Sequence, residues 1–395
     1  MTLRRGLARA ASATLVVLLV PGVASAQDTV AGVLSFLLTN RAVQTDDFQR
    51  DAAAAEATRQ TVTTLLGAEL TSIPPSLSSA GFTYRLNPVL GTVDRASDSF
   101  GSFFTERSLT AGRGRGSLGV NFRATGYQQL DGRDLREGRF LTTANQFRDE
   151  AQPFDEETLR LELSSRVLTF TGTYGVTDRF DVSAAVPVVS LTLTGERVNT
   201  YYGARAVQAS ADASATGLGD VVVRAKYGVW TRPSSGIALA GELRLPTGRE
   251  EDLLGVGDAA FSALLIASAE RGALGWHGNV SLGGGGGASE IAWRGAMCLA
   301  PSGRLTLVGE LVGRRVGDVG RIVEVRMPHP SIANVDTIRL VTQDTSVATA
   351  ALVGGAKWNL TGTWILSGHA MVPVSDAGLR SGVVALVGLD YAFGQ

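Results

Sequence analysis

From residue 81 onward, hydrophobic and polar residues alternate along the chain with a period of two. Between Asp220 and Trp230, one face carries valine, alanine and tyrosine, while the other carries Asp220, Arg224 and Lys226. The same alternation recurs in further segments up to the last residues of the chain. Because successive side chains of a β-strand point to opposite faces, each segment predicts a strand with one apolar and one charged face.

Two architectures show this alternation: a soluble sandwich with the apolar face inside, and a transmembrane barrel with the apolar face toward lipid. The barrel is favoured because the segments repeat between glycine-rich or charged turns and because the chain begins with an export signal. The terminal segment 381–393 also carries an apolar residue at every odd position from Val383 to Phe393. In lipid, only a closed sheet satisfies all its backbone groups. We therefore predict an all-β protein, a transmembrane antiparallel up-and-down β-barrel within residues 80–395.

The number of strands follows from the candidate segments. They lie near residues 81–90, 114–129, 157–174, 178–195, 217–231, 236–246, 255–270, 274–284, 289–299, 303–315, 346–358, 362–373 and 379–393. Bacterial single-chain barrels have even strand numbers, so we predict about 12 strands, with 14 as the upper limit. The apolar face changes parity at Val167 and Leu168, which indicates a β-bulge or a missed turn. A barrel of this size needs a plug, an infolded loop or a channel in its interior.

Residues 1–26 have the features of a signal peptide. Arg4, Arg5 and Arg9 precede a short apolar run, and the small residues 24–26 form a cleavage site. A membrane-anchoring helix is the alternative, but the run is too short to span a bilayer comfortably. Export places the chain in the bacterial cell outer membrane, where lipid and the barrel-assembly machinery are the expected partners.

Residues 27–79 are predicted to be largely helical. Asp46 and Gln49 resemble a capping box, and apolar residues recur at helical spacing from Phe48 to Leu66. Pro74 and Pro75 end the segment. This segment is either a periplasmic helix or a plug inside the pore, and the sequence leaves both possibilities open.

Composition excludes several classes of function. The formal net charge of -1 gives no basic field for nucleic acid. The single cysteine, Cys298, rules out an intramolecular disulfide and is expected to be a small buried apolar residue. His277, His329 and His369 lack the spacing of metal ligands. The five glycines 283–287 indicate a hairpin rather than a phosphate loop. No cofactor, metal or catalytic motif is therefore predicted.

The charged faces of the strands are the best candidate for a functional site. The residues predicted to line the lumen are Arg123, Arg160, Glu162, Arg166, Arg224, Lys226, Glu242, Arg244, Glu310 and Arg314. Their role is either structural, with opposite charges pairing across strands, or that of a mixed-charge pore lining. Because both signs are present, no strong preference for cations or anions is expected.

The terminal strand resembles the C-terminal assembly signal of outer-membrane proteins. In that pattern a glycine is followed at +3 and +5 by aromatic residues, here Gly388, Tyr391 and Phe393. Leu386 departs from the pattern, because its first position is usually polar. The alternative is that the segment is the last strand of any sheet, since alternation fits either setting.

Several segments also resemble a known family. Residues 174–182, with the sequence YGVTDRFDV, are similar to a recurring hairpin of the meta-pathway phenol-degradation family of outer-membrane proteins. The sequences GLGD at 217–220, RAKY at 224–227 and LPTG at 245–248 resemble its next landmarks, and residues 100–107 and 109–113 resemble a landmark of uncharacterised relatives. The family is similar in architecture to long-chain fatty-acid outer-membrane transporters. The resemblance implies uptake of hydrophobic or aromatic small molecules.

Three hypotheses follow. The leading one is an outer-membrane channel or transporter for passive uptake of small hydrophobic or aromatic molecules, restricted by residues 27–79 or by a long polar loop at 316–345. The second is a structural or adhesive barrel without transport, which would use that loop as its surface. The third is a membrane-embedded hydrolase using His369 and Ser367. Motifs that carry an enzymatic mechanism are lacking, so we predict a protein that is not an enzyme.

Overall fold

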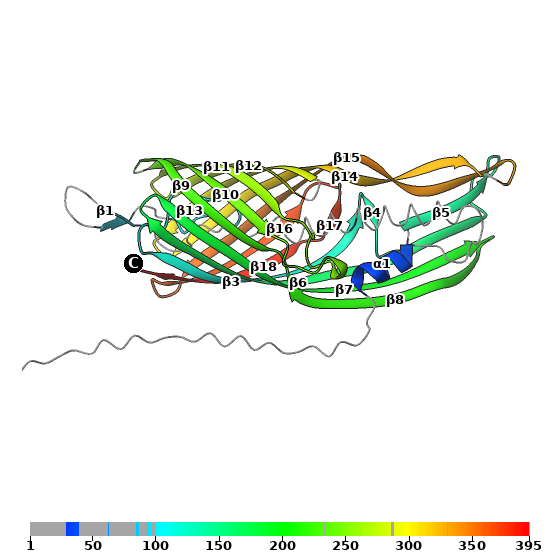
Figure 1. Ribbon diagram of the computed structural model, residues 1–395, viewed down its shortest axis with the longest axis horizontal. Helices are drawn as coiled ribbons and strands as arrows, with labels where there is room; N and C mark the ends of the chain where they lie inside the picture. Colours follow the sequence, from blue (N-terminus) through cyan, green and yellow to red (C-terminus); the bar gives the residue numbers. More distant parts are fainter. Residues whose placement is uncertain are drawn as a thin grey trace, which may run out of the picture.

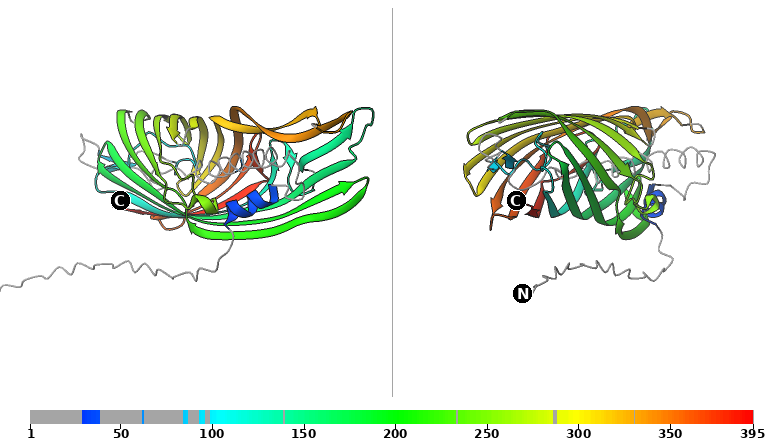
Figure 2. Two further views of the ribbon diagram at one scale, coloured as in Figure 1. Left: turned by 45° about the vertical axis from the view of Figure 1, so that its right-hand side comes forward. Right: turned by 60° about the vertical axis from the view of Figure 1, so that its left-hand side comes forward.

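A closed barrel dominates the computed structural model, which describes residues 29–38, 62, 84–86, 93–95, 99–138, 140–232, 234–285, 288–329 and 331–394 (Figures 1 and 2). Its 12 strands are β3 (Gly116–Leu130), β6 (Asp155–Thr177), β7 (Phe180–Tyr201), β9 (Val221–Arg232), β10 (Ser235–Leu245), β11 (Ala260–Arg271), β12 (Leu274–Gly285), β13 (Ala288–Ser302), β14 (Leu305–Pro328), β15 (Val335–Asn359), β16 (Trp364–Pro373) and β18 (Val384–Phe393). Neighbouring strands are antiparallel, and β18 pairs with β3 to close the ring. The predicted up-and-down barrel of 12 strands is confirmed.

The strand at 81–90 was wrongly assigned to the barrel. Within this range the structure describes residues 84–86, which form β1 (Tyr84–Leu86) and pair with β2 (Val93–Arg95) in a separate two-stranded sheet. The alternation over these few residues is therefore that of an isolated hairpin. Strands that the pattern did not reveal are β4 (Arg133–Asp134), β5 (Phe140–Phe147) and nearly all of β8 (Ala204–Leu218), whereas β17 (Leu379–Ser381) is the first part of the candidate segment 379–393.

The outside of the barrel is apolar, as lipid requires. On β18 the odd positions point outward, and Val383 and Val387 are 70% and 55% exposed. Near the end that holds the C-terminus, aromatic side chains form an outward-facing belt typical of a membrane interface. Its members with large exposed surfaces are Tyr174, Tyr227, Trp230, Trp276, Trp358 and Trp364.

The lengths of the connections orient the barrel in the membrane. At the end with the C-terminus, the strands are joined by turns as short as residues 178–179, 233–234 and 272–273. Some connections at the opposite end are as short, such as residues 202–203 between β7 and β8, but the longest ones lie there, and one of them, residues 246–259, contains the short helix η1 (Glu250–Asp252). Because short turns face the periplasm in bacterial barrels, we assign the C-terminal end to the periplasm and the opposite end to the outside.

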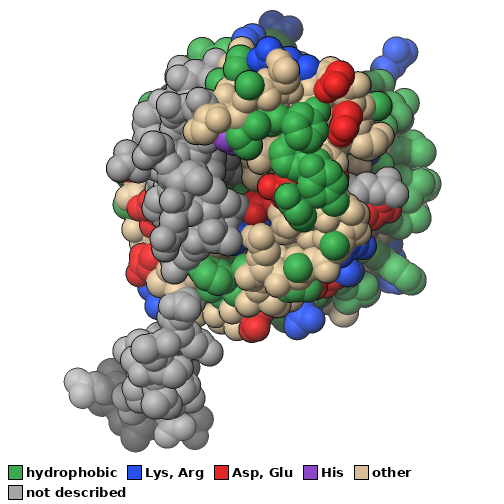
Figure 3. All heavy atoms as spheres, turned by 90° about the vertical axis from the view of Figure 1, so that its right-hand side faces the viewer, with side chains coloured by type: hydrophobic (Ala, Val, Ile, Leu, Met, Phe, Trp, Pro, Cys, Tyr) green, Lys and Arg blue, Asp and Glu red, His purple; other side chains and the backbone are tan. Residues whose placement is uncertain are grey.

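A sheet projects from the extracellular end on one side of the barrel (right in Figure 1). It consists of β8, β7, β6, β5, β15 and β14, paired in that order. Phe154 packs against Phe147, Tyr201 and Tyr202 near the turns of this sheet, with ring centroids 4.7 to 6.4 Å apart. Figure 3, which faces this end, shows hydrophobic side chains gathered at the surface among polar ones.

The change of parity near Val167 marks the edge of the membrane and is not a bulge. The pairing of β6 with β7 runs without a register shift from Asp155 to Gly175. Leu161 points inward above this level, whereas Phe170 points outward below it. The same alternate positions of β6 point inward along the whole strand. Outside the strand, the surroundings change from water to lipid at this level, so the apolar residues switch from the inward positions to the outward ones. The predicted bulge or turn is wrong for this reason.

The segment 316–345 is not a long loop. β14 and β15 continue through it as a hairpin that is paired as far as Pro328 and Asp336. Inward-facing apolar residues, among them Val319 and Ile322, bury this hairpin against the core and explain its order. The polar loop predicted from the charged outer face is therefore wrong.

Helix α1 (Val30–Leu38) packs on the inner face of the projecting sheet, toward the extracellular end. Thr29 caps it by accepting a hydrogen bond from the Gly32 N–H at 3.1 Å. A side chain at Gly195 would meet Leu37, so this glycine permits the close approach. Val62 is buried in the same core, but residues 1–26 and the other predicted helical residues of 27–79 lie outside the described part of the chain. No helix among the described residues is long and apolar enough to cross a membrane.

The assigned lipid boundary predicts where a charge is tolerated. Replacing Val387 with lysine is expected to lower the free energy of unfolding by about 2–4 kcal/mol, because the side chain faces the lipid. Replacing Thr194, which faces outward on the projecting part of β7, with lysine is expected to change it by less than about 0.5 kcal/mol. Denaturant unfolding in lipid vesicles measures both. Equal losses would show that the boundary is misplaced.

Candidate functional site

A segment of chain crosses the barrel lumen in its periplasmic half. We call residues 99–112 the plug segment. Phe100 donates its backbone N–H to Thr306 on β14 at 3.1 Å, and the N–H of Ala111 reaches Asp181 on β7 at 3.0 Å. β7 and β14 lie on opposite sides of the ring, with β9 to β13 between them. The side chains of Phe100, Phe104 and Arg107 are at most 1% exposed, so the plug segment obstructs the lumen.

Glu310 on β14 holds the first turn of the plug segment. Its carboxylate accepts hydrogen bonds from the backbone N–H groups of Phe103, Phe104 and Thr105, the last at 2.9 Å. The Thr105 hydroxyl donates to the same carboxylate at 2.8 Å. Hydrogen bonds to an ionised acceptor are the stronger kind, so this carboxylate is the main anchor of the turn.

The next residues are held by charges on β9 and β10. Arg224 pairs with Glu106 of the plug segment and with Glu242, and both pairs are almost completely buried. Asn279 on β12 bonds both backbone groups of Glu106, donating to its carbonyl at 2.9 Å. Gly101 has a φ of 72°, in the left-handed region, and places the chain beside the Arg107 guanidinium. Burial lowers the pKa of this guanidinium, and nearby Glu270 opposes the shift.

The last residues of the plug segment are bound by the periplasmic hairpin between β6 and β7 and by Lys226 on β9. Lys226 donates to the Leu109 carbonyl at 2.9 Å and pairs with Asp181 at 3.3 Å. Thr110 donates to the Asp178 carbonyl at 2.7 Å. Asp178, Asp181, Arg224 and Lys226 all belong to the motifs on which the resemblance to the phenol-degradation family depends. Those motifs therefore do more than form turns, since they hold the obstruction in the lumen.

An apolar part of the inner wall faces Phe103 and Phe104. The buried wall residues in this cluster are Cys298, Val308, Val312, Ala351, Val353, Met371, Val384 and Leu386. His369 stacks on Phe103 with ring centroids 4.0 Å apart and meets Phe104 edge-on at 5.2 Å. The wall on β13 to β18 thus gives the plug segment apolar contacts in addition to its charged anchors Glu310 and Lys357.

The structure divides the ten residues predicted to line the lumen into two groups. Those on inward-facing positions are Arg123, Arg224, Lys226, Glu242, Arg244, Glu310 and Arg314. Arg160, Glu162 and Arg166 instead face outward on the projecting part of β6, where Arg160 and Glu162 pair at 3.1 Å with more than half of each side chain exposed. Their polar face was taken as the inner one, but above the membrane the inner face is the apolar one.

The plug segment was not predicted as a lumen element. Residues 27–79 were predicted to be either a periplasmic helix or a plug, and residues 100–107 were recognised only by their resemblance to a landmark of relatives. The signal that it carried was a polar, glycine-containing stretch with three phenylalanines and no alternation, directly before the first barrel strand. Alternation cannot detect such a stretch, because its partners come from many different strands.

A second motif pair stabilises the extracellular rim. Asp220 of the GLGD motif is buried and accepts hydrogen bonds from the N–H groups of Gly248 at 3.1 Å and Val256 at 3.0 Å. Thr247 of the LPTG motif donates to the Gly219 carbonyl at 2.7 Å. The two motifs therefore join the start of β9 to the loop between β10 and β11.

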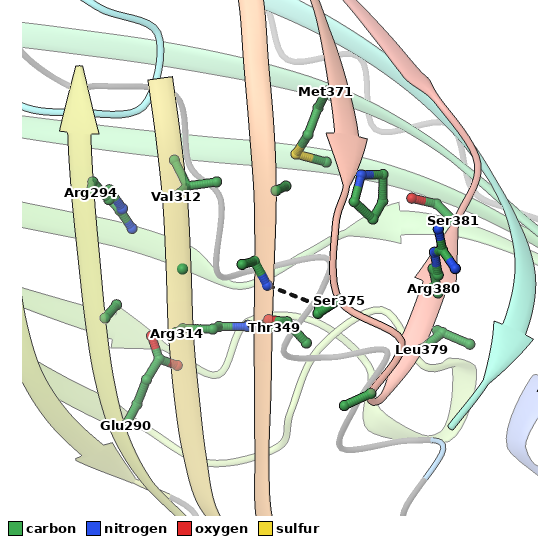
Figure 4. Close-up of a pocket in the computed structure, with 16 residues that line it drawn as sticks. Glu290, Arg294, Val312, Arg314, Thr349, Met371, Ser375, Leu379, Arg380 and Ser381 are labelled. Atoms are coloured by element: carbon green, nitrogen blue, oxygen red, sulfur yellow. Dashed lines mark hydrogen bonds between the residues drawn. The ribbon is translucent and has the colours of Figure 1, made fainter. Parts of the chain in front are cut away.

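Above the plug segment, a pocket opens in the wall where β16 and β17 separate (Figure 4). It encloses about 640 Å³, counting the part that is open to solvent. The lining residues come from β13 to β17: Glu290, Ala292, Arg294, Val312, Gly313, Arg314, Thr349, Ala350, Ala351, Met371, Pro373, Ser375, Ala377, Leu379, Arg380 and Ser381. A mixture of apolar side chains and a few polar groups is typical of small-molecule sites.

The histidines do not form an enzymatic or metal site in the described part of the chain. Neither ring nitrogen of His369 has a hydrogen-bond partner there, whereas a Ser–His–acid triad needs bonds from both. His277 bonds the Ser268 hydroxyl at 3.0 Å, and His329 accepts from the N–H groups of the β14–β15 turn. No group of three His, Cys, Asp or Glu side chains among the described residues could hold a metal ion.

The predicted assembly signal lies on β18. Tyr391 contacts Trp364 on the outer surface, with ring centroids 5.0 Å apart. A side chain at Gly388 would meet Asn121 on β3 and Ser367 on β16, so the position requires glycine for packing alone. Recognition of Gly388, Tyr391 and Phe393 by the assembly machinery stays a prediction.

Three solved structures of barrels are similar to the chain. The COG4313 outer membrane channel from Pseudomonas putida F1 has 12% identity and a TM-score of 0.48, over 72% of this chain and 98% of that one. The KdgM porin in complex with disordered oligogalacturonate has 10% identity and a TM-score of 0.38, over 70% and 99%. The CymD monoaromatic hydrocarbon channel has 11% identity and a TM-score of 0.27, over 72% and 90%. No curated protein matches the chain.

A family model matches the central part of the chain. The matched residues, 145–283, run from the end of β5 to β12 and include the YGVTDRFDV, GLGD, RAKY and LPTG motifs. The model is described as "Putative MetA-pathway of phenol degradation". Over residues 145–283 the chain thus carries the pattern of this phenol-degradation family, which confirms the resemblance that its hairpin motifs predict.

Proposed function

We propose that the protein is an outer-membrane channel for the passive uptake of small hydrophobic or aromatic molecules. The observation that carries the proposal is a lipid-facing barrel whose lumen holds a small-molecule pocket directly above an obstructing segment. The family match supports an aromatic substrate, because its description refers to phenol degradation. In this proposal a molecule enters from the extracellular end, occupies the pocket and passes when the plug segment shifts.

Uptake by whole cells tests this proposal. The host is a Gram-negative strain that lacks its own aromatic uptake channels and keeps its lipopolysaccharide barrier, and the probe is radiolabelled toluene at a low concentration. Expression of the protein is expected to raise the initial rate of uptake severalfold. Replacing Ala292, which faces the pocket on β13, with phenylalanine is expected to remove most of this gain.

Ile291 provides the matched control, because it is the neighbouring residue and faces lipid, 47% exposed. Its replacement with phenylalanine is expected to leave uptake unchanged. Heat-modifiable gel mobility confirms that each variant has folded. Uptake equal to that of cells without the protein would contradict the proposal, and it would favour a structural or adhesive role for the aromatic cluster of Phe147, Phe154, Tyr201 and Tyr202 on the projecting sheet.

A further inference from the structure

The pocket above the plug segment has a positively charged side. Arg294 on β13, Arg314 on β14 and Arg380 on β17 line it, whereas Glu290 is the one carboxylate in the lining (Figure 4). The arginines come from three separate strands, so the barrel itself brings their charges together. A guanidinium presents its N–H donors in a planar fork that matches a carboxylate.

The arginine side chains are positioned by neighbouring groups. Arg314 donates from Nε to the Thr349 hydroxyl on β15 at 3.3 Å. Arg294 donates to the carbonyl of Phe104 in the plug segment at 3.2 Å. Arg380 donates to Gln129 at 3.2 Å and pairs with Asp376 at 2.6 Å. Asp376 therefore offsets much of the charge of Arg380, and the excess of positive charge comes from Arg294 and Arg314, which outnumber Glu290 in the lining.

Next to these arginines, part of the pocket lining is apolar. Val312, Ala351 and Met371 face it and belong to the buried cluster around Phe103 and Phe104. Leu379 closes the other side and is 7% exposed. An apolar wall next to an excess of arginine suits a molecule with a flat apolar body and one anionic group.

We propose that this pocket selects small aromatic carboxylates, with benzoate as the simplest example. The carboxylate would lie toward Arg314 and Arg294, and the ring would lie against Val312, Ala351 and Met371. The inference narrows the substrates of the proposed channel and therefore rests on the proposed function. It separates charged aromatic acids from neutral aromatic molecules of the same shape.

Binding to the purified protein in detergent tests the inference. Titration calorimetry compares benzoate with benzamide, which has nearly the same shape but no charge, and with the cation benzylammonium. Benzoate is expected to bind at least about tenfold more tightly than benzamide, because its hydrogen bonds to guanidinium are charge-assisted. Benzylammonium is expected to bind more weakly than benzamide.

Two neighbouring arginines on β14 provide a matched pair of variants. Arg314→Gln is expected to remove the preference for benzoate over benzamide. Arg315, whose side chain faces away from the pocket and bonds Ser346 at 2.9 Å, serves as the control, and Arg315→Gln is expected to keep the preference. Arg380→Gln gives a second test from a different strand, with a smaller loss expected because Asp376 already pairs with this residue. Heat-modifiable gel mobility again verifies folding.

Equal affinities for benzoate and benzamide would overturn the inference, and so would an unchanged preference in Arg314→Gln. The proposed function is judged separately, by toluene uptake. Uptake of toluene without a preference for benzoate would support the proposed channel but contradict its proposed selectivity for aromatic carboxylates. A benzoate preference without uptake of either compound would place a binding site in a barrel that does not transport.

Discussion

Replacing Glu310 with alanine is expected to raise the open probability of single channels in planar bilayers by at least about a hundredfold. The carboxylate accepts hydrogen bonds from three consecutive N–H groups and one hydroxyl of the plug segment. Hydrogen bonds to charged groups contribute about 1.5–3 kcal/mol each. Since about 1.4 kcal/mol changes an equilibrium tenfold, losing two such bonds is enough for this shift.

Glu162 is the matched control for this experiment. It is also a glutamate on a long strand, but it faces outward, and its side chain is 57% exposed. Its replacement with alanine is expected to leave the conductance unchanged. Glu310→Gln is expected to be intermediate, because the amide keeps one acceptor oxygen but turns a donor toward the N–H groups. A Glu310→Ala channel with the open probability of the unaltered protein would show that the plug segment is a fixed part of the wall.

Replacing Arg224 with methionine is expected to lower the free energy of unfolding by about 3–5 kcal/mol. The Arg224 side chain is 2% exposed and pairs with Glu106 and Glu242, which are 1% and 13% exposed. Without the guanidinium, two buried carboxylates remain close together in the lumen and both lose their direct ion-pair partner. Thermal unfolding in detergent, followed by the heat-modifiable shift in gel mobility, measures the loss.

The exposed pair of Arg160 and Glu162 again supplies the comparison. Arg160→Met is expected to change stability by less than about 1 kcal/mol, because exposed ion pairs contribute little. The double variant with Glu106→Gln and Arg224→Met is expected to recover part of the loss, because only one unpaired carboxylate remains. Equal losses for Arg224→Met and Arg160→Met would mean that the Arg224 pair is open to water.

The approximate number of strands and, for most of them, the face toward lipid were accessible from the sequence, and the reason is local. The period of two is a property of a single strand, and Val383 to Phe393 shows it without any partner. Residues 81–90 misled the strand count because a short hairpin shows the same alternation. Alternation alone also does not say whether lipid or water surrounds the barrel, because one apolar and one polar face fit both surroundings.

The outward position of Arg160, Glu162 and Arg166 is a feature that the pattern within a single strand cannot predict. Above the membrane the barrel wall becomes a water-exposed sheet, and its apolar face turns toward the core formed with α1. The change of parity at Val167 and Leu168 marks this level in the sequence, but it does not say which side of the strand meets water, because the backbone continues unaltered through it. The depth of a strand in the membrane depends on the whole assembled barrel.

The sequence by itself determined the closed transmembrane barrel, the family resemblance and seven of the inward charges, because each depends on short-range patterns. Only the tertiary structure decided what those charges contact. The plug segment lacks periodicity, and its anchors Asp181, Arg224, Lys226 and Glu310 lie between about 70 and 210 residues away along the chain. The pocket likewise depends on the distance between strands that are not neighbours in sequence. Such sites arise from the closure of the ring, which brings its opposite walls within reach of one segment.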